Sequence, residues 1–196
     1  MKSIIRAFIA IELPLEIHQK LGEISTALQH KLEGMPIRWV HPDNIHLTLK
    51  FLGDVSVAQL EALQKMLETE VSGHSEFEIG IGELGAYPNP RRPHVIWIGV
   101  KAPLELRNVQ YGIETQMERL GYGREERPFS PHLTLGRVAR QASSSETRKI
   151  GDILNTNKVG FLGSTRVKSI HLFKSELRPG GAIYTRIFTA RLGNFG

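Results

Sequence analysis

The sequence contains no cysteine and no apolar run of membrane-spanning length. Without cysteine, a disulfide framework, a thiolate nucleophile and a cysteine-based metal site are excluded. A membrane-spanning helix needs about 20 consecutive apolar residues, and no run approaches that length. The apolar N-terminal stretch is interrupted by Glu12 and lacks a small-residue cleavage site, which favours a strand over a signal peptide. We therefore expect a cytoplasmic protein with no membrane association.

Acidic residues are fewer than basic ones, 20 Asp and Glu against 25 Lys and Arg, which gives a formal net charge of +5 at pH 7. This excess mildly favours a polyanionic partner, although many proteins of similar charge never bind nucleic acid. Hydrophobic residues make up 40% of the 196 residues and charged residues 23%, as in ordinary globular proteins. Charge and composition alone therefore leave the function open.

The most informative feature is a tetrapeptide that occurs twice, as His46-Leu47-Thr48-Leu49 and as His132-Leu133-Thr134-Leu135. Polar and apolar residues alternate in both copies, which is typical of a half-buried strand. Successive side chains of a strand point to opposite faces. Each strand is therefore expected to present a histidine and a threonine on one face, with two leucines packed behind them.

The two motifs lie in an approximately duplicated framework. Each motif strand is preceded by a strand and a helix that begins with proline, Pro14 or Pro103, and is followed by a helix and a hairpin. A duplicated unit of this kind tends to pack with pseudo-twofold symmetry. We expect an α+β fold over residues 1–196, a single bilobal domain with one motif per lobe. Two antiparallel sheets would flank a central cleft, helices would lie outside, and His46 would face His132 across the cleft.

Local patterns give the expected element boundaries. Strands are expected at 4–13, 37–40 and 45–52, the last closed by Gly53-Asp54, and hairpins at 77–98 and 167–192. Helices are expected to follow Pro14, Ser56, Pro103 and Ser143. Ser56 with Gln59 forms a candidate capping box, and the region from Ser143 to Glu146 is expected to cap a helix that runs to about Leu154.

Two histidines near each other suit a reaction that needs an acid and a base, because the unperturbed pKa of histidine is about 6.5. Phosphodiester cleavage has this requirement. Thr48 and Thr134 would donate hydrogen bonds to the non-bridging oxygens, and nearby arginines would contact the phosphate. No metal is required, and no zinc-binding motif such as His-Glu-x-x-His is present. The other six histidines are interpreted as structural.

Three segments resemble the two-histidine phosphoesterase superfamily, and within it the RNA 2′,3′-cyclic phosphodiesterase or 2′-5′ RNA ligase family. They are the opening Arg6 to Pro14, the run Asn44 to Gly53, and Pro128 to Arg137. The resemblance covers essentially the whole chain. It implies a bilobal α+β fold, no cofactor, and hydrolysis of an RNA 2′,3′-cyclic phosphate end to a 2′-phosphomonoester. It also implies RNA or tRNA fragments as partners, and we expect a monomer.

Carried over by motif, His46 is expected to donate a proton to the departing 3′ oxygen and His132 to activate water. Thr48 and Thr134 would bind the phosphate. Phe51 and Arg137, five residues after each histidine, would contact the nucleotide, with core packing an equal alternative for Phe51.

In a regular strand, the residue five positions after the histidine points to the face opposite the histidine and the threonine. A bulge at Gly136 would turn Arg137 back to the face of His132 and Thr134. The near-symmetric strands give no internal reason to choose which histidine is the donor. Two other functions stay open: a 2′-5′ ligase that joins tRNA halves, and a non-catalytic RNA-binding protein.

Overall fold

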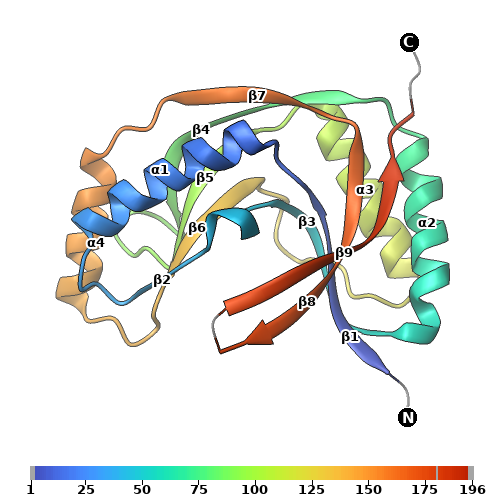
Figure 1. Ribbon diagram of the computed structural model, residues 1–196, viewed down its shortest axis with the longest axis horizontal. Helices are drawn as coiled ribbons and strands as arrows, with labels where there is room; N and C mark the ends of the chain where they lie inside the picture. Colours follow the sequence, from blue (N-terminus) through green and yellow to red (C-terminus); the bar gives the residue numbers. More distant parts are fainter. Residues whose placement is uncertain (1–2, 180, 194–196) are drawn as a thin grey trace.

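The computed structural model describes residues 3–179 and 181–193, which form an α+β fold of four α-helices and nine strands (Figure 1). None of these helices is long and apolar enough to cross a membrane. In chain order the elements are β1 (Ile4–Ile11), α1 (Leu15–Lys31), β2 (Ile37–Trp39), the 3-10 turn η1 (Pro42–Asn44), β3 (Leu47–Ser56), the 3-10 turn η2 (Val57–Gln59), α2 (Leu60–Ser72), β4 (Phe77–Tyr87), β5 (Val95–Lys101), α3 (Leu104–Arg119), β6 (His132–Val138), α4 (Ser144–Thr156), β7 (Phe161–Val167), β8 (Ser169–Arg178) and β9 (Gly181–Arg191).

The nine strands form one continuous antiparallel sheet rather than the two separate sheets expected, because the motif strands β3 and β6 pair with each other. Strands β3, β1, β8 and β9 form one half of this sheet, which we call the first lobe together with α2 and α3. Strands β7, β4, β5 and β6, with β2 added beside β6, form the second lobe together with α1 and α4. A single residue pair between β3 and β6, Leu47 with Leu133, joins them into one continuous path. The predicted α+β fold with a duplicated unit and outer helices is confirmed.

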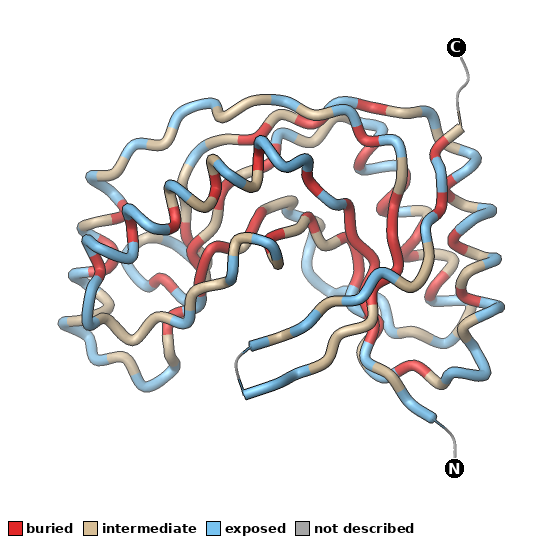
Figure 2. The backbone as a smooth tube through the Cα atoms, viewed as in Figure 1, coloured by how far each residue is buried: buried red, intermediate tan, exposed pale blue. Residues whose placement is uncertain are grey.

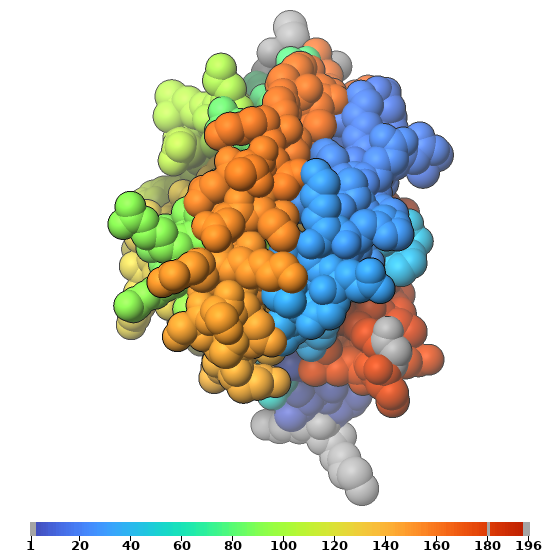
Figure 3. All heavy atoms as spheres, turned by 90° about the vertical axis from the view of Figure 1, so that its left-hand side faces the viewer, coloured from blue at the N-terminus to red at the C-terminus, as the bar shows by residue number. Residues whose placement is uncertain are grey.

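The two halves of the chain exchange helices between the lobes. Helix α1 follows β1 of the first lobe but covers the second, where Lys20 Nζ donates to the Leu162 carbonyl at 2.9 Å. Helix α3 follows β5 of the second lobe but covers the first, where Gln110 Nε2 donates to the Leu49 carbonyl at 3.4 Å. Figure 3 shows α1, in blue, lying against the α4–β7 segment, in orange. The exchange packs each of these helices against strands contributed by the other half of the chain.

The core follows the predicted periodicity. The inward positions of the helices are buried, with Ile17, Leu21 and Leu28 in α1 and Leu106, Val109, Ile113 and Met117 in α3. Full burial of one such side chain contributes about 1.5–3 kcal/mol. Buried residues concentrate along the strands and on the helix faces turned toward them (Figure 2). Strand β1 is buried on both faces from Ala7 to Ile11, as expected for a central strand.

Four details test the local predictions. Strand β3 does not end at Gly53-Asp54 as expected. Gly53 adopts a φ of 69°, but pairing with β1 continues past it to Ser56. The Ser56 capping box is wrong, since Ser56 makes no side-chain cap hydrogen bond. The cap at Ser143 is confirmed, with Ser143 and Glu146 forming a reciprocal capping box. Edge strand β7 was not predicted, because its half-exposed residues around Gly163 lack clear alternation.

Candidate active site

The two motif strands lie side by side and antiparallel, with Leu47 opposite Leu133. Both leucines are fully buried. In an antiparallel pair, the position before one residue lies beside the position after its partner. His46 is therefore adjacent to Thr134, and Thr48 to His132, all on the face opposite the leucines. We call this surface the His/Thr face. The predicted opposition of the strands across a cleft is replaced by this edge-to-edge arrangement, because Leu47 and Leu133 pair directly within the sheet.

Both imidazoles are held by the same backbone contact. His46 Nδ1 lies 2.7 Å from the carbonyl oxygen of Asn44, and His132 Nδ1 lies 2.7 Å from that of Ser130. A carbonyl oxygen can only accept, so Nδ1 carries the proton in both rings. Such a contact fixes the tautomer and orientation of the ring. Nε2 is therefore the atom available for proton transfer in each histidine.

His46 sits in an aromatic pocket of the first lobe. Its ring stacks on Phe8, with ring centroids 4.7 Å apart, and meets the edge of Tyr184 at 5.2 Å. Burial lowers the pKa of His46 from 6.5 to about 4, with a smaller lowering from His18. The hydrogen bond to the Asn44 carbonyl and the negative charge of Glu12 act in the opposite direction. His46 is thus neutral at pH 7 when no anion is bound.

His132 is more open and lies among different groups. Its ring meets Tyr87 edge-on at a centroid distance of 5.0 Å, and the Trp97 ring lies at 6.5 Å. Burial lowers the pKa of His132, the Ser130 carbonyl opposes that effect, and the Arg137 charge adds to it. The Tyr87 hydroxyl is itself held by the Ser130 hydroxyl at 2.6 Å. The two histidines therefore share a backbone contact but differ in their surroundings.

Both motif strands carry a one-residue bulge directly after the threonine. In the first lobe Ala10 pairs with Thr48 and Ile9 with Lys50, so Leu49 is the extra residue. In the second lobe Trp97 pairs with Thr134 and Ile96 with Gly136, so Leu135 is the extra residue. A bulge places two residues opposite one and shifts the facing of the residues that follow. The bulge predicted around Gly136 is present, and β3 has its equivalent.

The bulges bring Phe51 and Arg137 onto the His/Thr face. Phe51 is the cross-strand partner of Phe8, whose ring stacks on His46. Arg137 is in register with Val95, and Val95 with Tyr87, whose ring contacts His132. Residues in one cross-strand row share a face. All six residues expected at the site therefore lie on one surface, two histidines and two threonines in the middle and one position-five residue on each side.

The sequence interpretation missed several side chains that border this face. Arg38 of β2 pairs with Arg137, and Trp97 pairs with Thr134. Tyr184 comes from the β8–β9 hairpin, which also reaches η1, where Asn44 Nδ2 donates to the Ala182 carbonyl at 2.8 Å. His18 of α1 contacts the Pro42 carbonyl at 3.0 Å. These contacts join segments far apart in the chain, so no local pattern signals them.

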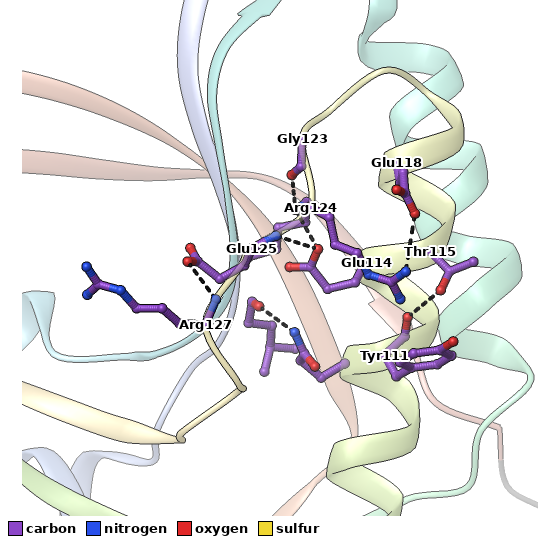
Figure 4. Close-up of polar contacts among 11 residues, drawn as sticks. Tyr111, Glu114, Thr115, Glu118, Gly123, Arg124, Glu125 and Arg127 are labelled. Carbon is purple, nitrogen blue, oxygen red and sulfur yellow. Dashed lines mark hydrogen bonds and ion pairs between the residues drawn. The ribbon is translucent and has the colours of Figure 1, made fainter.

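A buried ion pair fixes the segment that leads into β6. Lys50 Nζ lies 2.8 Å from Glu114 Oε2 and also donates to the Gly123 carbonyl at 2.8 Å. The backbone nitrogen of Glu125 donates to the same Glu114 oxygen at 3.4 Å. Figure 4 shows Glu114 on α3 reaching this segment, with Arg127 further along it. Strand β3, helix α3 and the approach to His132 are thereby connected.

Among residues 3–179 and 181–193, no group of three or more histidine, aspartate or glutamate side chains is arranged to hold a metal ion. The groups placed for chemistry on the His/Thr face are thus two imidazoles, two hydroxyls and arginine. Such a set can transfer two protons and bind an anion.

Comparison with known proteins gives one consistent result. The family model described as LigT like Phosphoesterase matches twice, over residues 11–97 and 98–184, in agreement with the duplication. A relative from Methanothermobacter thermautotrophicus, named RNA 2′,3′-cyclic phosphodiesterase, is 34% identical over 189 residues, which cover 96% of this chain and 99% of the relative. A protein of the same name from Escherichia coli is 30% identical over 184 residues, 92% of each chain.

Solved structures agree with the sequence matches. The crystal structure of Escherichia coli LigT complexed with 3′-AMP superposes with a TM-score of 0.77 at 28% identity, covering 97% of this chain and 99% of the other. The structure of TT0787 from Thermus thermophilus has a TM-score of 0.76 at 26% identity and covers 97% of this chain and all of the other. The fold, its duplication and both motif strands thus lie within the matched regions.

Proposed function

Because the chain belongs to the LigT-like phosphoesterase family, we propose that it hydrolyses RNA 2′,3′-cyclic phosphate ends, with His46 and His132 as acid and base. The two relatives that bear the name of this activity match the chain over nearly their full length. The observation that supports the residue roles best is the matched pair of Nδ1–carbonyl contacts, 2.7 Å each, which leaves both Nε2 atoms free on one face. A protein that only binds RNA has no need for two imidazoles held by the same Nδ1–carbonyl contact.

In the proposed reaction two protons are transferred, both by histidine side chains. His132 Nε2 takes a proton from a water molecule, and the water oxygen attacks phosphorus. The bond between phosphorus and O3′ breaks, and O3′ receives a proton from His46 Nε2. The product carries a 2′-phosphomonoester and a free 3′ hydroxyl. Each positioned proton transfer is worth about 10²–10⁴-fold in rate.

Thr48 and Thr134 are proposed to bind the two non-bridging oxygens of the phosphate. Each threonine lies beside the histidine of the other strand, so the four side chains surround one position on the His/Thr face. Hydroxyl donors aimed at oxygens that gain charge in the transition state lower the barrier. Phe51 would contact the terminal base and Arg137 the phosphate, one from each lobe.

His46 can act as the proton donor only if the bound phosphate first raises its pKa. Burial holds the pKa of His46 at about 4 in the free protein, so the ring is neutral at pH 7. An anion within a few Å favours the protonated ring, and Glu12 already acts in that direction. Binding of the cyclic phosphate, which carries one negative charge, is proposed to bring the proton onto His46. The acid is then formed only when substrate is present.

The deciding experiment is incubation of the protein with an oligonucleotide that ends in a 2′,3′-cyclic phosphate, in the presence of EDTA. We expect a 2′-phosphate product and no effect of the chelator. His46→Ala and His132→Ala should each lose turnover by at least about 10²-fold while remaining folded. His30→Ala, an exposed histidine on α1, is the matched control. Full activity in both site variants would rule out the acid–base assignment. Stable binding without product would favour the RNA-binding alternative, and joining of added tRNA halves would favour the ligase.

A further inference from the structure

Two arginines lie next to each other at the second-lobe end of the His/Thr face. Arg38 of β2 is the cross-strand partner of Arg137 of β6, so both side chains leave the sheet on the same face. Both are exposed. Their charges also act on Tyr184, whose pKa they lower against the larger raising effect of burial. Like charges directly opposite each other destabilise a strand pair. The arrangement therefore favours an anion bound over the pair.

The arginine pair continues into an open groove of about 640 Å³. A third exposed arginine, Arg140, lines this groove together with Gln141. Its wall is fixed by the backbone, because the Ala139 nitrogen donates to the Pro36 carbonyl at 2.8 Å. The arginine–carboxylate pairs found within residues 3–179 and 181–193 involve other arginines, namely Arg124, Arg166 and Arg186. The groove thus presents positive charge that the described carboxylates do not neutralise.

The first-lobe end of the face has the opposite chemistry. Phe51 occupies the position in the first motif strand that Arg137 occupies in the second, and it is 66% exposed. It lies beside Phe8, which contacts Phe173 and Tyr184. Exposed aromatic rings stack on nucleobases, whereas arginines contact phosphates. A ligand that spans the face would therefore place a base at the first-lobe end and anionic groups at the other.

A nucleoside 2′,3′-cyclic phosphate has only one phosphate, which His46, His132, the two threonines and Arg137 would hold, so Arg38 and Arg140 are left without an anion. It offers no second anion to the groove. An RNA strand does, because every nucleotide before the last adds a phosphodiester. Building on the proposed function, we propose that Arg38 and Arg140 form a subsite that binds the phosphodiesters preceding the terminal nucleotide of the RNA strand.

The test compares two substrates in the same variants. Adenosine 2′,3′-cyclic phosphate has no preceding phosphodiester, and a six-nucleotide RNA with a 2′,3′-cyclic phosphate has five. For Arg38→Ala and Arg140→Ala, kcat/KM on the oligonucleotide should fall roughly tenfold each, as expected for one lost charged hydrogen bond. The value for the mononucleotide should be unchanged. The slope of log kcat/KM against log salt on the oligonucleotide should become shallower by about one per arginine. Arg107→Ala on the outer helix α3 is the matched control, and Arg38→Lys should recover part of the loss.

Equal losses on both substrates, or no loss on the oligonucleotide, would overturn the proposal. Binding of a fluorescent six-nucleotide RNA that ends in a 3′-phosphate gives a readout independent of turnover. The same variants should weaken this binding roughly tenfold without weakening the binding of adenosine 3′-monophosphate. If wild-type protein hydrolysed neither cyclic substrate, the proposed reaction would be refuted, and the binding measurement would still decide whether the groove holds RNA.

Discussion

The amine of Lys50 lies 2.8 Å from a carboxylate oxygen of Glu114, and the two side chains are only 2% and 7% exposed. Lys50 occupies the position next to the Leu49 bulge in β3, and Glu114 lies on α3. The pair also holds the backbone of Gly123 and Glu125, on the approach to β6. One buried contact thus links the strand that follows His46 to the segment that precedes His132.

Loss of Lys50 should be strongly destabilising, because it leaves the Glu114 charge buried and unpaired. We expect Lys50→Ala to lower the free energy of unfolding by about 3–5 kcal/mol, measured by urea denaturation. The double variant Lys50→Met with Glu114→Leu should recover most of the loss. Arg124→Ala, which breaks the exposed pair with Glu118, should cost less than about 1 kcal/mol. A Lys50→Ala protein as stable as the wild type would contradict the assigned role.

Stability should fall as the pH is lowered through the range set by His46. Burial lowers the pKa of His46 in the folded protein to about 4, below its ordinary 6.5. Between these values the unfolded chain binds a proton that the folded protein does not, so stability decreases from pH 6.5 to pH 4 and then levels off for this group. The full effect is about 3 kcal/mol at most. Urea denaturation at several pH values should show a weaker dependence in His46→Gln, while His30→Gln should behave as wild type.

The pH dependence of kcat/KM should be bell-shaped with an acidic optimum. The proposed mechanism needs one proton shared by the two histidines, which substrate binding would place on His46. Burial lowers the pKa of His46 to about 4, and it also lowers that of His132 below 6.5. Because both pKa values lie below 6.5, the singly protonated form is populated mainly below that pH, and kcat/KM should decline above pH 6.5. Initial rates from pH 3.5 to 8 at low substrate would reveal it. An optimum above pH 7 would mean that other groups control the rate.

The threonine hydroxyls should affect chemistry more than stability. Thr48→Val and Thr134→Val keep the β-branched shape that suits a strand but remove the hydrogen-bond donor. We expect kcat to fall by about 10²-fold in each variant, as for other donors to a developing anion. Thr165→Val, in strand β7 away from the His/Thr face, should retain full activity. A loss confined to KM would indicate ground-state binding only.

Gly85 should be intolerant of any side chain. It pairs with Trp97, and a Cβ at this position would lie 2.2 Å from the Trp97 ring. Gly85→Ala must therefore displace the indole, which sits beside Thr134. A destabilisation of about 1–3 kcal/mol and a decrease in kcat are expected, measured by thermal unfolding and by turnover. Gly160→Ala, which has open space around it, is the control and should change neither.

The sequence by itself determined the pieces of the site and their local form. Alternation in the two His-Leu-Thr-Leu segments fixes a histidine and a threonine on one side of a strand, because side chains alternate whatever the strand pairs with. Helical periodicity located α1, α2 and α3, and the cap region at Ser143 located α4. The duplication of the chain and its family are confirmed by two matches to one family model. Even the bulge near Gly136 could be inferred, since without it Arg137 would point away from its histidine.

Only the tertiary structure decided how these pieces meet. The register of Leu47 with Leu133, the exchange of α1 and α3 between lobes, and the placement of Arg38 beside Arg137 join residues far apart in the chain. Such pairings depend on which surfaces bury the most apolar area and satisfy backbone hydrogen bonds together, not on any local period. The same is true of Lys50 and Glu114. The sequence supplied two strands that each carry a histidine and a threonine, and long-range packing set them beside each other, antiparallel, on one face.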